Sequence, residues 1–196
     1  MATDPAETAG VAFLGPLGTY SHQAALQFSA NHAVTLYAKH SIQETVDAGK
    51  SRRADPTERT VIVVPFINSV QGGVLETFAC LADPNFFGPD ALKIVDEVDL
   101  TIAHALIVRR GAGVPADDLS TIRVVRSHPQ ALGQCSDFLS SRLPHAQLEE
   151  AQSTADAVSL LRADDNSAAV ASELSAELLD ASVLFRGIQN SNGKFT

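Results

Sequence analysis

The sequence has few of the residues that mark secreted, membrane-spanning or nucleic-acid-binding proteins. Two cysteines and no tryptophan occur among 196 residues, which does not favour a disulfide-stabilised fold. The longest apolar runs, such as 61–66 and 103–108, are far too short to cross a bilayer. A net charge of −9 without any basic stripe argues against binding to nucleic acid.

The N-terminus and the cysteines indicate a cytoplasmic protein. The opening run Met-Ala-Thr-Asp-Pro-Ala-Glu-Thr contains neither a basic nor an apolar segment, so no secretory signal is visible. Cys80 and Cys135 each lie in an apolar helical pattern and lack metal-ligand spacing. We therefore expect reduced core thiols, no metal and no membrane association.

Apolar runs alternate with helical patterns along the chain. The hydrophobic content of 45% is enough for the core of one domain or two small lobes. Strands are predicted near 11–15, 34–38, 61–66, 93–98, 102–109, 122–126, 146–150, 168–171 and 182–188. Helices are predicted near 21–31, 41–50, 72–82, 129–142, 154–163 and 172–180. This alternation predicts an α/β architecture with mostly parallel sheets.

The first of four polar motifs is the run from Val11 to His22, Val-Ala-Phe-Leu-Gly-Pro-Leu-Gly-Thr-Tyr-Ser-His. Its Gly-Pro-x-Gly turn delivers Thr19, Tyr20 and Ser21 to the start of a predicted helix. Hydroxyls and backbone N–H groups at a helix start form a ready site for an anion.

The second motif, residues 61–73, is a buried strand that ends at Pro65 before Asn68, Ser69 and two glycines. Asn68 and Ser69 either cap the following helix or contact a ligand.

The third motif, residues 124–135, reads Val-Val-Arg-Ser-His-Pro-Gln-Ala-Leu-Gly-Gln-Cys. Ser127 is predicted to cap a helix whose first turn contains His128 and Gln130. His128 could be a structural hydrogen bonder, a substrate contact or a proton donor. The fourth motif places Ser153 and Thr154 at another helix start, where they act as caps or line a ligand site. Ligands of open α/β sheets bind beyond the carboxyl ends of strands, so these junctions indicate a cleft enzyme or a binding protein.

Together these motifs resemble those of prephenate dehydratases, which remove carbon dioxide and water from the dicarboxylate prephenate. The run from Val11 is similar to the opening motif of that family. Residues 128–135 are similar to its His-Pro-Gln-Ala-Leu-x-Gln-Cys motif, and residues 65–72 to its Pro-x-Glu-Asn-Ser-x-x-Gly motif. The resemblance covers roughly residues 10–196.

The chain departs from the family pattern at several residues, of which Ile67 and Gly193 replace groups suited to departure of the hydroxyl. Ile67 stands where the family has Glu, and Ala79 stands where it usually has Asp in a Thr-x-Asp pattern. Alignment with the Asn-x-Thr-Arg-Phe motif places Gly193 at the Thr regarded as central to dehydration. Lys194 then occupies the position of the Arg and keeps its charge without the planar fork.

The resemblance implies a two-lobed α/β fold of the type II periplasmic-binding-protein-like class, with an interlobe active-site cleft. We expect lobe 1 to comprise about 1–78 plus 183–196 and lobe 2 about 100–182, without a regulatory domain. The expected partner is a small-molecule dicarboxylate, bound without a cofactor by a homodimer or higher homo-oligomer.

The resemblance also assigns candidate roles. The catalytic candidates are Asn68, Ser69, His128 and Lys194, and the substrate-binding candidates are Thr19, Tyr20, Ser21, Gln130, Ser153 and Thr154. Four functions stay open: a prephenate-type lyase with altered dehydration, an ordinary prephenate dehydratase, a repurposed catalyst of specialised metabolism acting on another carboxylate-bearing ring, and a non-catalytic carboxylate-binding protein.

Overall fold

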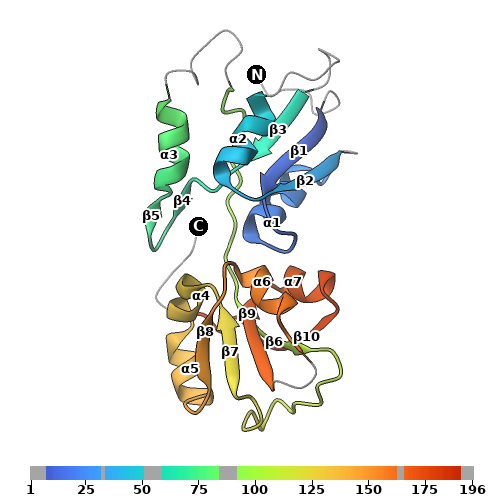
Figure 1. Cartoon of the computed structure of the whole chain (residues 1–196), viewed down its shortest axis with the longest axis vertical. Coiled ribbons are helices and arrows are strands. Elements are labelled where there is room, and N and C mark those ends of the chain that lie inside the picture. Colours follow the sequence, from blue (N-terminus) through green and yellow to red (C-terminus); the bar gives the residue numbers. More distant parts are fainter. Residues whose placement is uncertain (1–7, 32–33, 51–58, 84–91, 163–165, 191–196) are drawn as a thin grey trace. The chain divides into compact units, whose positions relative to one another are not determined.

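The computed structural model describes residues 8–31, 34–50, 59–83, 92–162 and 166–190 (Figure 1). These residues form two compact units. The first unit contains the described residues of 8–16 and 20–100, and the second unit contains 17–19 and those of 101–190. The chain thus contributes three residues of the first motif to the second unit before it returns to the first.

The first unit is built on a three-stranded parallel sheet of order β2-β1-β3. The strands are β1 (Thr8–Leu14), β2 (Thr35–Lys39) and β3 (Arg59–Val63). Strand β1 is central, and its Val11 lies opposite Leu36 on β2 and Val61 on β3. Because successive side chains of a strand point to opposite faces, β1 supplies apolar side chains to both sides of the sheet.

Three helices cover this sheet, namely α1 (Tyr20–Phe28), α2 (Ile42–Lys50) and α3 (Leu75–Ala82). On one face, Val11 and Phe13 pack against Ala25 of α1. On the other face, Ile42, Val46 and Cys80 of α2 and α3 form a second cluster. A short hairpin of β4 (Ile67–Asn68) and β5 (Gly72–Gly73) precedes α3.

The second unit contains a five-stranded mixed sheet of order β10-β6-β9-β7-β8. Its strands are β6 (Ala105–Arg109), β7 (Val124–Ser127), β8 (Gln147–Glu150), β9 (Ser167–Ala171) and β10 (Ala181–Arg186). Strand β7 pairs in parallel with β8 and β9, whereas β6 runs antiparallel to β9 and β10.

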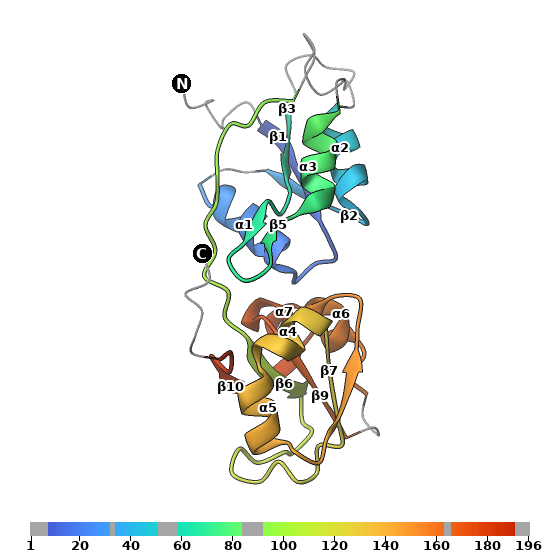
Figure 2. The ribbon, with the colours of Figure 1, turned by 90° about the vertical axis from the view of Figure 1, so that its left-hand side faces the viewer.

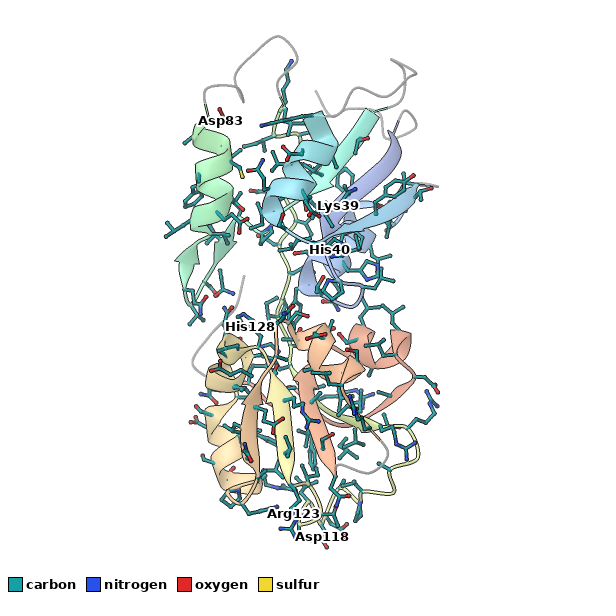
Figure 3. The ribbon with its side chains drawn as sticks, viewed as in Figure 1. Lys39, His40, Asp83, Asp118, Arg123 and His128 are labelled. Carbon is teal, nitrogen blue, oxygen red and sulfur yellow. The ribbon has the colours of Figure 1, made fainter. Side chains whose placement is uncertain are left out.

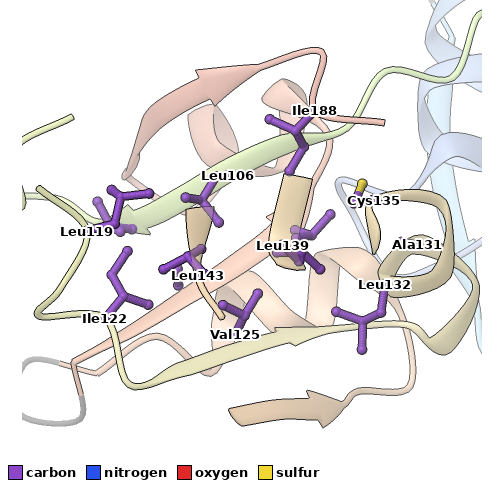
Figure 4. Packing of buried hydrophobic residues seen from close by; sticks show 13 residues of the cluster. Leu106, Leu119, Ile122, Val125, Ala131, Leu132, Cys135, Leu139, Leu143 and Ile188 are labelled. Atoms are coloured by element: carbon purple, nitrogen blue, oxygen red, sulfur yellow. The ribbon is translucent and has the colours of Figure 1, made fainter. Parts of the chain in front are cut away.

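Helices cover both faces of the second sheet (Figure 2). They are α4 (Pro129–Gln134), α5 (Ser136–Arg142), α6 (Thr154–Ser159) and α7 (Glu173–Leu178). Alternate residues of β6 divide between two cores: Leu106 and Val108 join the α4–α5 side (Figure 4), and Ala105 and Ile107 join the α6–α7 side. Burial on both faces explains why β6 and β9 read as nearly continuous apolar runs.

Several sequence expectations differ from the structure. Residues 93–98, predicted as a strand, have no regular secondary structure, and Ile94 is 76% exposed. An apolar pattern alone does not form a strand, because a strand needs a neighbour for its backbone hydrogen bonds. The helix predicted over 129–142 is divided at Cys135 into α4 and α5. The β4–β5 hairpin lies where the start of the helix near 72–82 was expected.

The expected lobe boundaries also need correction. Residues 183–190 were assigned to lobe 1, but β10 pairs with β6 and belongs to the second unit. Residues 79–83 and 92–100 belong to the first unit. The remaining segment of that expectation, 191–196, lies outside the described residues.

The described part of the chain also bears on two features that the composition raised. None of its helices is long and apolar enough to cross a membrane. Cys80 and Cys135 are unpaired thiols in the core, as predicted. Burial raises the pKa of Cys135 to about 12, which keeps this thiol protonated and unreactive.

Truncation of Leu106, which is fully buried, is expected to destabilise the second unit. Leu106→Ala should lower the free energy of unfolding by about 2–5 kcal/mol, because it removes apolar contacts and leaves a cavity. Leu148→Ala, at a side chain 49% exposed on β8, is the control and should cost much less. Urea unfolding of the two variants measures the difference, and equal losses would contradict the described core.

Candidate functional site

The second unit gathers polar groups at one edge of its sheet. Strands β8, β7 and β9 are parallel neighbours, so their carboxyl ends meet at the same edge. His128 follows β7, Ser153 follows β8 and Ser172 follows β9, and each is the N-cap of a helix. The first backbone N–H groups of α4, α6 and α7 therefore open toward this edge, which we call the polar edge.

The antiparallel strands bring two further segments to the polar edge. Ala105, at the beginning of β6, pairs with Ala171 at the end of β9, and Arg186, at the end of β10, pairs with Ala105. The residue before β6, His104, and the segment after β10, residues 187–190, consequently lie at the same edge. Sequence reasoning missed these segments because parallel strands were expected there.

The third motif is held at its helix start by a different residue from the one predicted. His128, at the N-terminal end of α4 (Figure 3), accepts a hydrogen bond at Nδ1 from the backbone N–H of Gln130 at 3.3 Å. Ser127, predicted to be the cap, is fully buried and donates from Oγ to the Val170 carbonyl at 2.5 Å. The Ser127 prediction was wrong because the side chain of this last strand residue faces the neighbouring strand. The half-buried His128 thus makes a structural hydrogen bond through Nδ1, and its Nε2 is not used in this bond.

The fourth motif forms the start of α6. Ser153 accepts at Oγ a hydrogen bond from the backbone N–H of Asp156 at 3.0 Å, as expected for a capping serine. Thr154, the first residue of α6, is 9% exposed. The carbonyl of Ser127 accepts from the backbone N–H of Ala151 at 2.8 Å, which joins the third motif to the segment before the fourth.

Gly18 and Thr19 of the first motif belong to this second unit. A Cβ atom added to Gly18 would lie 3.4 Å from Cβ of Ala155 on α6 and 3.0 Å from Oγ of Ser175 on α7. Gly18 therefore packs closely against the starts of both helices. The structure in this way brings Thr19 of the first motif to the region of Ser153 and Thr154, although more than a hundred residues separate them in sequence.

A buried histidine lies at the polar edge and was missed by the sequence analysis. His104 is 2% exposed, and its Nε2 lies 2.7 Å from Oε1 of Gln134, the last residue of α4. Desolvation by burial lowers the pKa of His104, and the hydrogen bond to Gln134 opposes this in part. Among the described side chains, Gln134 has a buried Nε2 donor without a hydrogen-bond partner. The position of Gln134 in the third motif was the available signal.

The same residues hold the segment that leads to the C-terminus. The backbone N–H of Ile188 donates to the His104 carbonyl at 3.0 Å, and that of Asn190 donates to the Gln134 carbonyl at 2.7 Å. Asn190 also accepts at Oδ1 from the backbone N–H of Asp137 at 3.1 Å. These bonds place the chain at the polar edge up to residue 190; Gly193 and the catalytic candidate Lys194 lie outside the described residues.

In the first unit, Asn68 forms a turn instead of capping a helix. Its Oδ1 accepts from the backbone N–H groups of Val70 and Gln71 at 2.9 and 3.2 Å, and Ser69 is exposed within that turn. The N-cap of α3 is Val74, which makes no side-chain capping bond. The capping alternative for Asn68 and Ser69 was therefore wrong, because the β4–β5 hairpin separates them from the helix.

Two hydrogen bonds join this hairpin to α3 and the residues before it. Thr77 of α3 is 1% exposed and donates from Oγ1 to the Pro65 carbonyl at 2.7 Å. The backbone N–H of Val74 donates to the Phe66 carbonyl at 2.9 Å. Ile67, at the position where the resemblance expects Glu, is 61% exposed on β4. The hairpin thus presents an apolar side chain at that position.

The other candidates of the first unit lie at the beginning of α1. Tyr20 and Ser21 are its first two residues and are half-buried. His22 follows them, is 5% exposed and stacks on Phe13 with ring centroids 4.8 Å apart. Over the described ranges, no group of three or more His, Cys, Asp or Glu side chains could hold a metal ion.

A family model described as prephenate dehydratase matches residues 11–196 of the chain. The chain belongs to the prephenate dehydratase family. A curated relative, the bifunctional chorismate mutase/prephenate dehydratase of Escherichia coli (strain K12), is 34% identical over 197 residues, which cover 96% of this chain and 46% of the relative. The chain thus spans about half the length of the curated relatives that it matches.

Solved structures similar to this chain include a prephenate dehydratase and a protein described by another activity. The prephenate dehydratase of Arthrobacter aurescens, determined in complex with L-Phe, has a TM-score of 0.73 and 29% identity, covering 96% of this chain and 58% of that one. GqqA, described as a novel type of quorum quenching acylase, has a TM-score of 0.74 and 25% identity, covering 92% and 60% of the two chains. The expected type II periplasmic-binding-protein-like α/β class is confirmed as the fold of the prephenate dehydratase family.

The buried histidine predicts a loss of stability in acid. Because the pKa of folded His104 lies below its ordinary value of 6.5, the unfolded chain binds more protons once the pH falls below 6.5. The free energy of unfolding should therefore fall from there until the pH passes the folded-state pKa. His104→Gln, which stays uncharged, should reduce this fall in urea unfolding measured from about pH 7.5 to about pH 5. Burial also lowers the pKa of His22, so part of the fall should persist. Identical pH profiles for the two proteins would contradict the assignment to His104.

Proposed function

We propose that this chain is a lyase acting on prephenate, with phenylpyruvate, carbon dioxide and water as products. Family membership supports an enzyme that acts on prephenate. The observation that carries the proposal is the polar edge, where Thr19, His128, Gln130, Ser153 and Thr154 come from separate parts of the sequence to one end of the second sheet. All five belong to motifs that this chain has in common with the family.

The polar edge suits a substrate with two carboxylates. The net charge of −9 repels an anionic substrate, so such a substrate needs local hydrogen-bond donors. Hydroxyls and helix N–H groups supply these donors. We propose that these groups bind a carboxylate of prephenate. Arg126 on β7 is not proposed as the cation that binds this carboxylate, since its Nε pairs with Oε2 of Glu149 at 2.8 Å.

The chemistry requires binding and assisted departure of a hydroxyl group. Cleavage of the bond to the ring carboxylate releases carbon dioxide, and its electron pair enters the diene. The pair then shifts through the ring and expels the hydroxyl group, which leaves with a proton as water. Aromatisation drives the step, so the protein must hold the dianion and place a proton donor at the leaving group. His128, with Nε2 directed away from its capping bond, is the described side chain that we propose for this donation.

The first unit supplies further proposed contacts. Because Asn68 Oδ1 is used by the turn, its amide nitrogen is the atom available to donate to substrate. Ser69 is exposed next to it, and Tyr20 and Ser21 lie at the start of α1. We propose that these residues contribute to prephenate binding and that Lys194 supports the anion by its charge.

A second candidate function is decarboxylation with altered or absent dehydration. It is favoured by Ile67, an exposed apolar side chain where the family has Glu, and by Gly193 at the position of the family Thr. Both changes remove groups suited to hydroxyl departure while leaving the polar edge intact. A product that keeps the hydroxyl group would place the chain in specialised metabolism.

The product of the reaction distinguishes the two functions. Incubation with prephenate, followed by mass analysis, should give phenylpyruvate. If residues 67, 193 and 194 limit proton donation, Gly193→Thr combined with Lys194→Arg and Ile67→Glu should raise the rate of phenylpyruvate formation at least tenfold. Proton donation typically contributes about 10²–10⁴-fold to a rate. A decarboxylated product that retains the hydroxyl group would establish the second function. If the unmodified chain formed neither product and did not bind prephenate, both proposed functions would be overturned.

Loss of single donors should weaken binding. Thr154→Val and, separately, Ser69→Ala should each raise the Kd for prephenate about ten- to hundredfold, because a hydrogen bond to a charged group is worth about 1.5–3 kcal/mol. Ser140→Ala is the control, since Ser140 is exposed and donates to the Asp137 carbonyl within α5. Calorimetric titration measures the three constants. Unchanged affinity in both variants would remove these residues from the site.

We further propose that the chain acts in the cytoplasm, as a homodimer or higher homo-oligomer. Exposed apolar side chains on the hairpin and α3 are compatible with assembly; they include Phe66, Ile67, Val70 and Leu75. Light scattering across a concentration series determines the oligomer number.

A further inference from the structure

Two buried serines outside the four motifs hold the backbone of the first motif. Ser172 and Ser175 are 1% and 0% exposed at the start of α7. Their Oγ atoms lie 3.0 and 2.8 Å from the carbonyl oxygen of Gly18 and 3.0 Å from each other. Each hydroxyl has one proton, so in every arrangement of the pair at least one serine donates to Gly18. We call this arrangement the serine clamp.

The clamp holds the carbonyl group of a position that requires glycine. Gly18 has φ +89°, a conformation that L side chains rarely adopt. A Cβ atom there would also lie 3.0 Å from Oγ and 3.2 Å from Cα of Ser175. The close approach allows both hydroxyls to reach the same carbonyl oxygen. The orientation of the Gly18 carbonyl is therefore fixed from two directions.

Fixing this carbonyl also fixes the next amide. The peptide bond between Gly18 and Thr19 is planar, and in a trans peptide the C=O and N–H groups point in opposite directions. With its carbonyl held against Ser172 and Ser175, this peptide directs the Thr19 N–H away from α7. The clamp thus determines how Thr19, a proposed substrate contact, presents its backbone.

We propose that Ser172 and Ser175 are positioning residues, which hold Gly18 so that Thr19 is oriented for a carboxylate of the substrate. The proposal rests on the proposed function for the identity of the ligand. The geometry of the clamp does not depend on that function. The existence of the clamp and its effect on prephenate binding can therefore be tested separately.

The redundancy of the clamp gives a distinctive mutational pattern. Ser175→Ala leaves Ser172 to donate, and Ser172→Ala leaves Ser175, so each single variant should raise the Kd for prephenate less than about threefold. The double variant loses both donors and should raise it at least tenfold, which is more than the product of the single effects. Binding is measured well below the melting temperature, where all the proteins are folded.

Two controls separate positioning from lost stability. Ser172 also caps α7 by accepting from the Ser175 N–H at 3.2 Å, and Ser41→Ala removes a similar capping bond, of 3.0 Å to the Glu44 N–H, from the first unit. Thr45→Val removes a buried hydroxyl that donates to the Ser41 carbonyl at 2.8 Å. Both controls should lower the melting temperature without changing the Kd for prephenate.

Hydrogen–deuterium exchange tests the clamp without any substrate. Peptides that span residues 15–22 should exchange at least tenfold faster in the double variant, and at the unmodified rate in Ser41→Ala and Thr45→Val. Unchanged exchange in the double variant would overturn the clamp. Faster exchange with unchanged prephenate affinity would overturn the positioning of Thr19. Absence of prephenate binding by the unmodified chain would instead overturn the proposed function, and exchange would still decide whether the clamp exists.

Discussion

The parallel pairing of β7 with both β8 and β9 is the constraint on which the candidate site depends. It brings three strand ends to one edge, and each strand is followed within three residues by the polar N-cap of a helix. The antiparallel strands β6 and β10 add His104 and residues 187–190 at the same edge. Gly18 then packs against two of the helix starts. No single segment of the chain contains the site, since the sheet assembles it from six separate segments.

Much of this arrangement could be predicted from the sequence. The strand–helix junctions of the first, third and fourth motifs are local features, and turn residues and apolar runs identified them correctly. Ser153 is the cap that its position predicted. Local patterns failed where a choice depends on a neighbouring strand: Ser127 bonds to Val170 on β9, so His128 becomes the cap instead.

Other parts could not be predicted because the responsible contacts join residues far apart in sequence. His104 meets Gln134 and the C-terminal segment only through the antiparallel return of β10. Ser172 and Ser175 read as an ordinary helix start until Gly18 is placed against them. The pattern of residues 93–98 predicted a strand, but a strand needs a hydrogen-bonding neighbour, which no local pattern reveals. Such long-range pairing limits what one sequence can show.

The second sheet also has unequal faces. On the side of α6 and α7, β9 presents the small side chains of Ala169 and Ala171, and β6 presents Ala105 and the larger Ile107. The side of α4 and α5 receives Leu106, Val108, Ala168 and Val170. Helices pack closer to a sheet when the intervening side chains are small. Ala169 and Ala171 therefore allow α6 to lie close to β9, and adding two methyl groups at either position would displace that helix. Changes at these purely apolar positions would reach the candidate site through displacement of a helix, without touching a polar group.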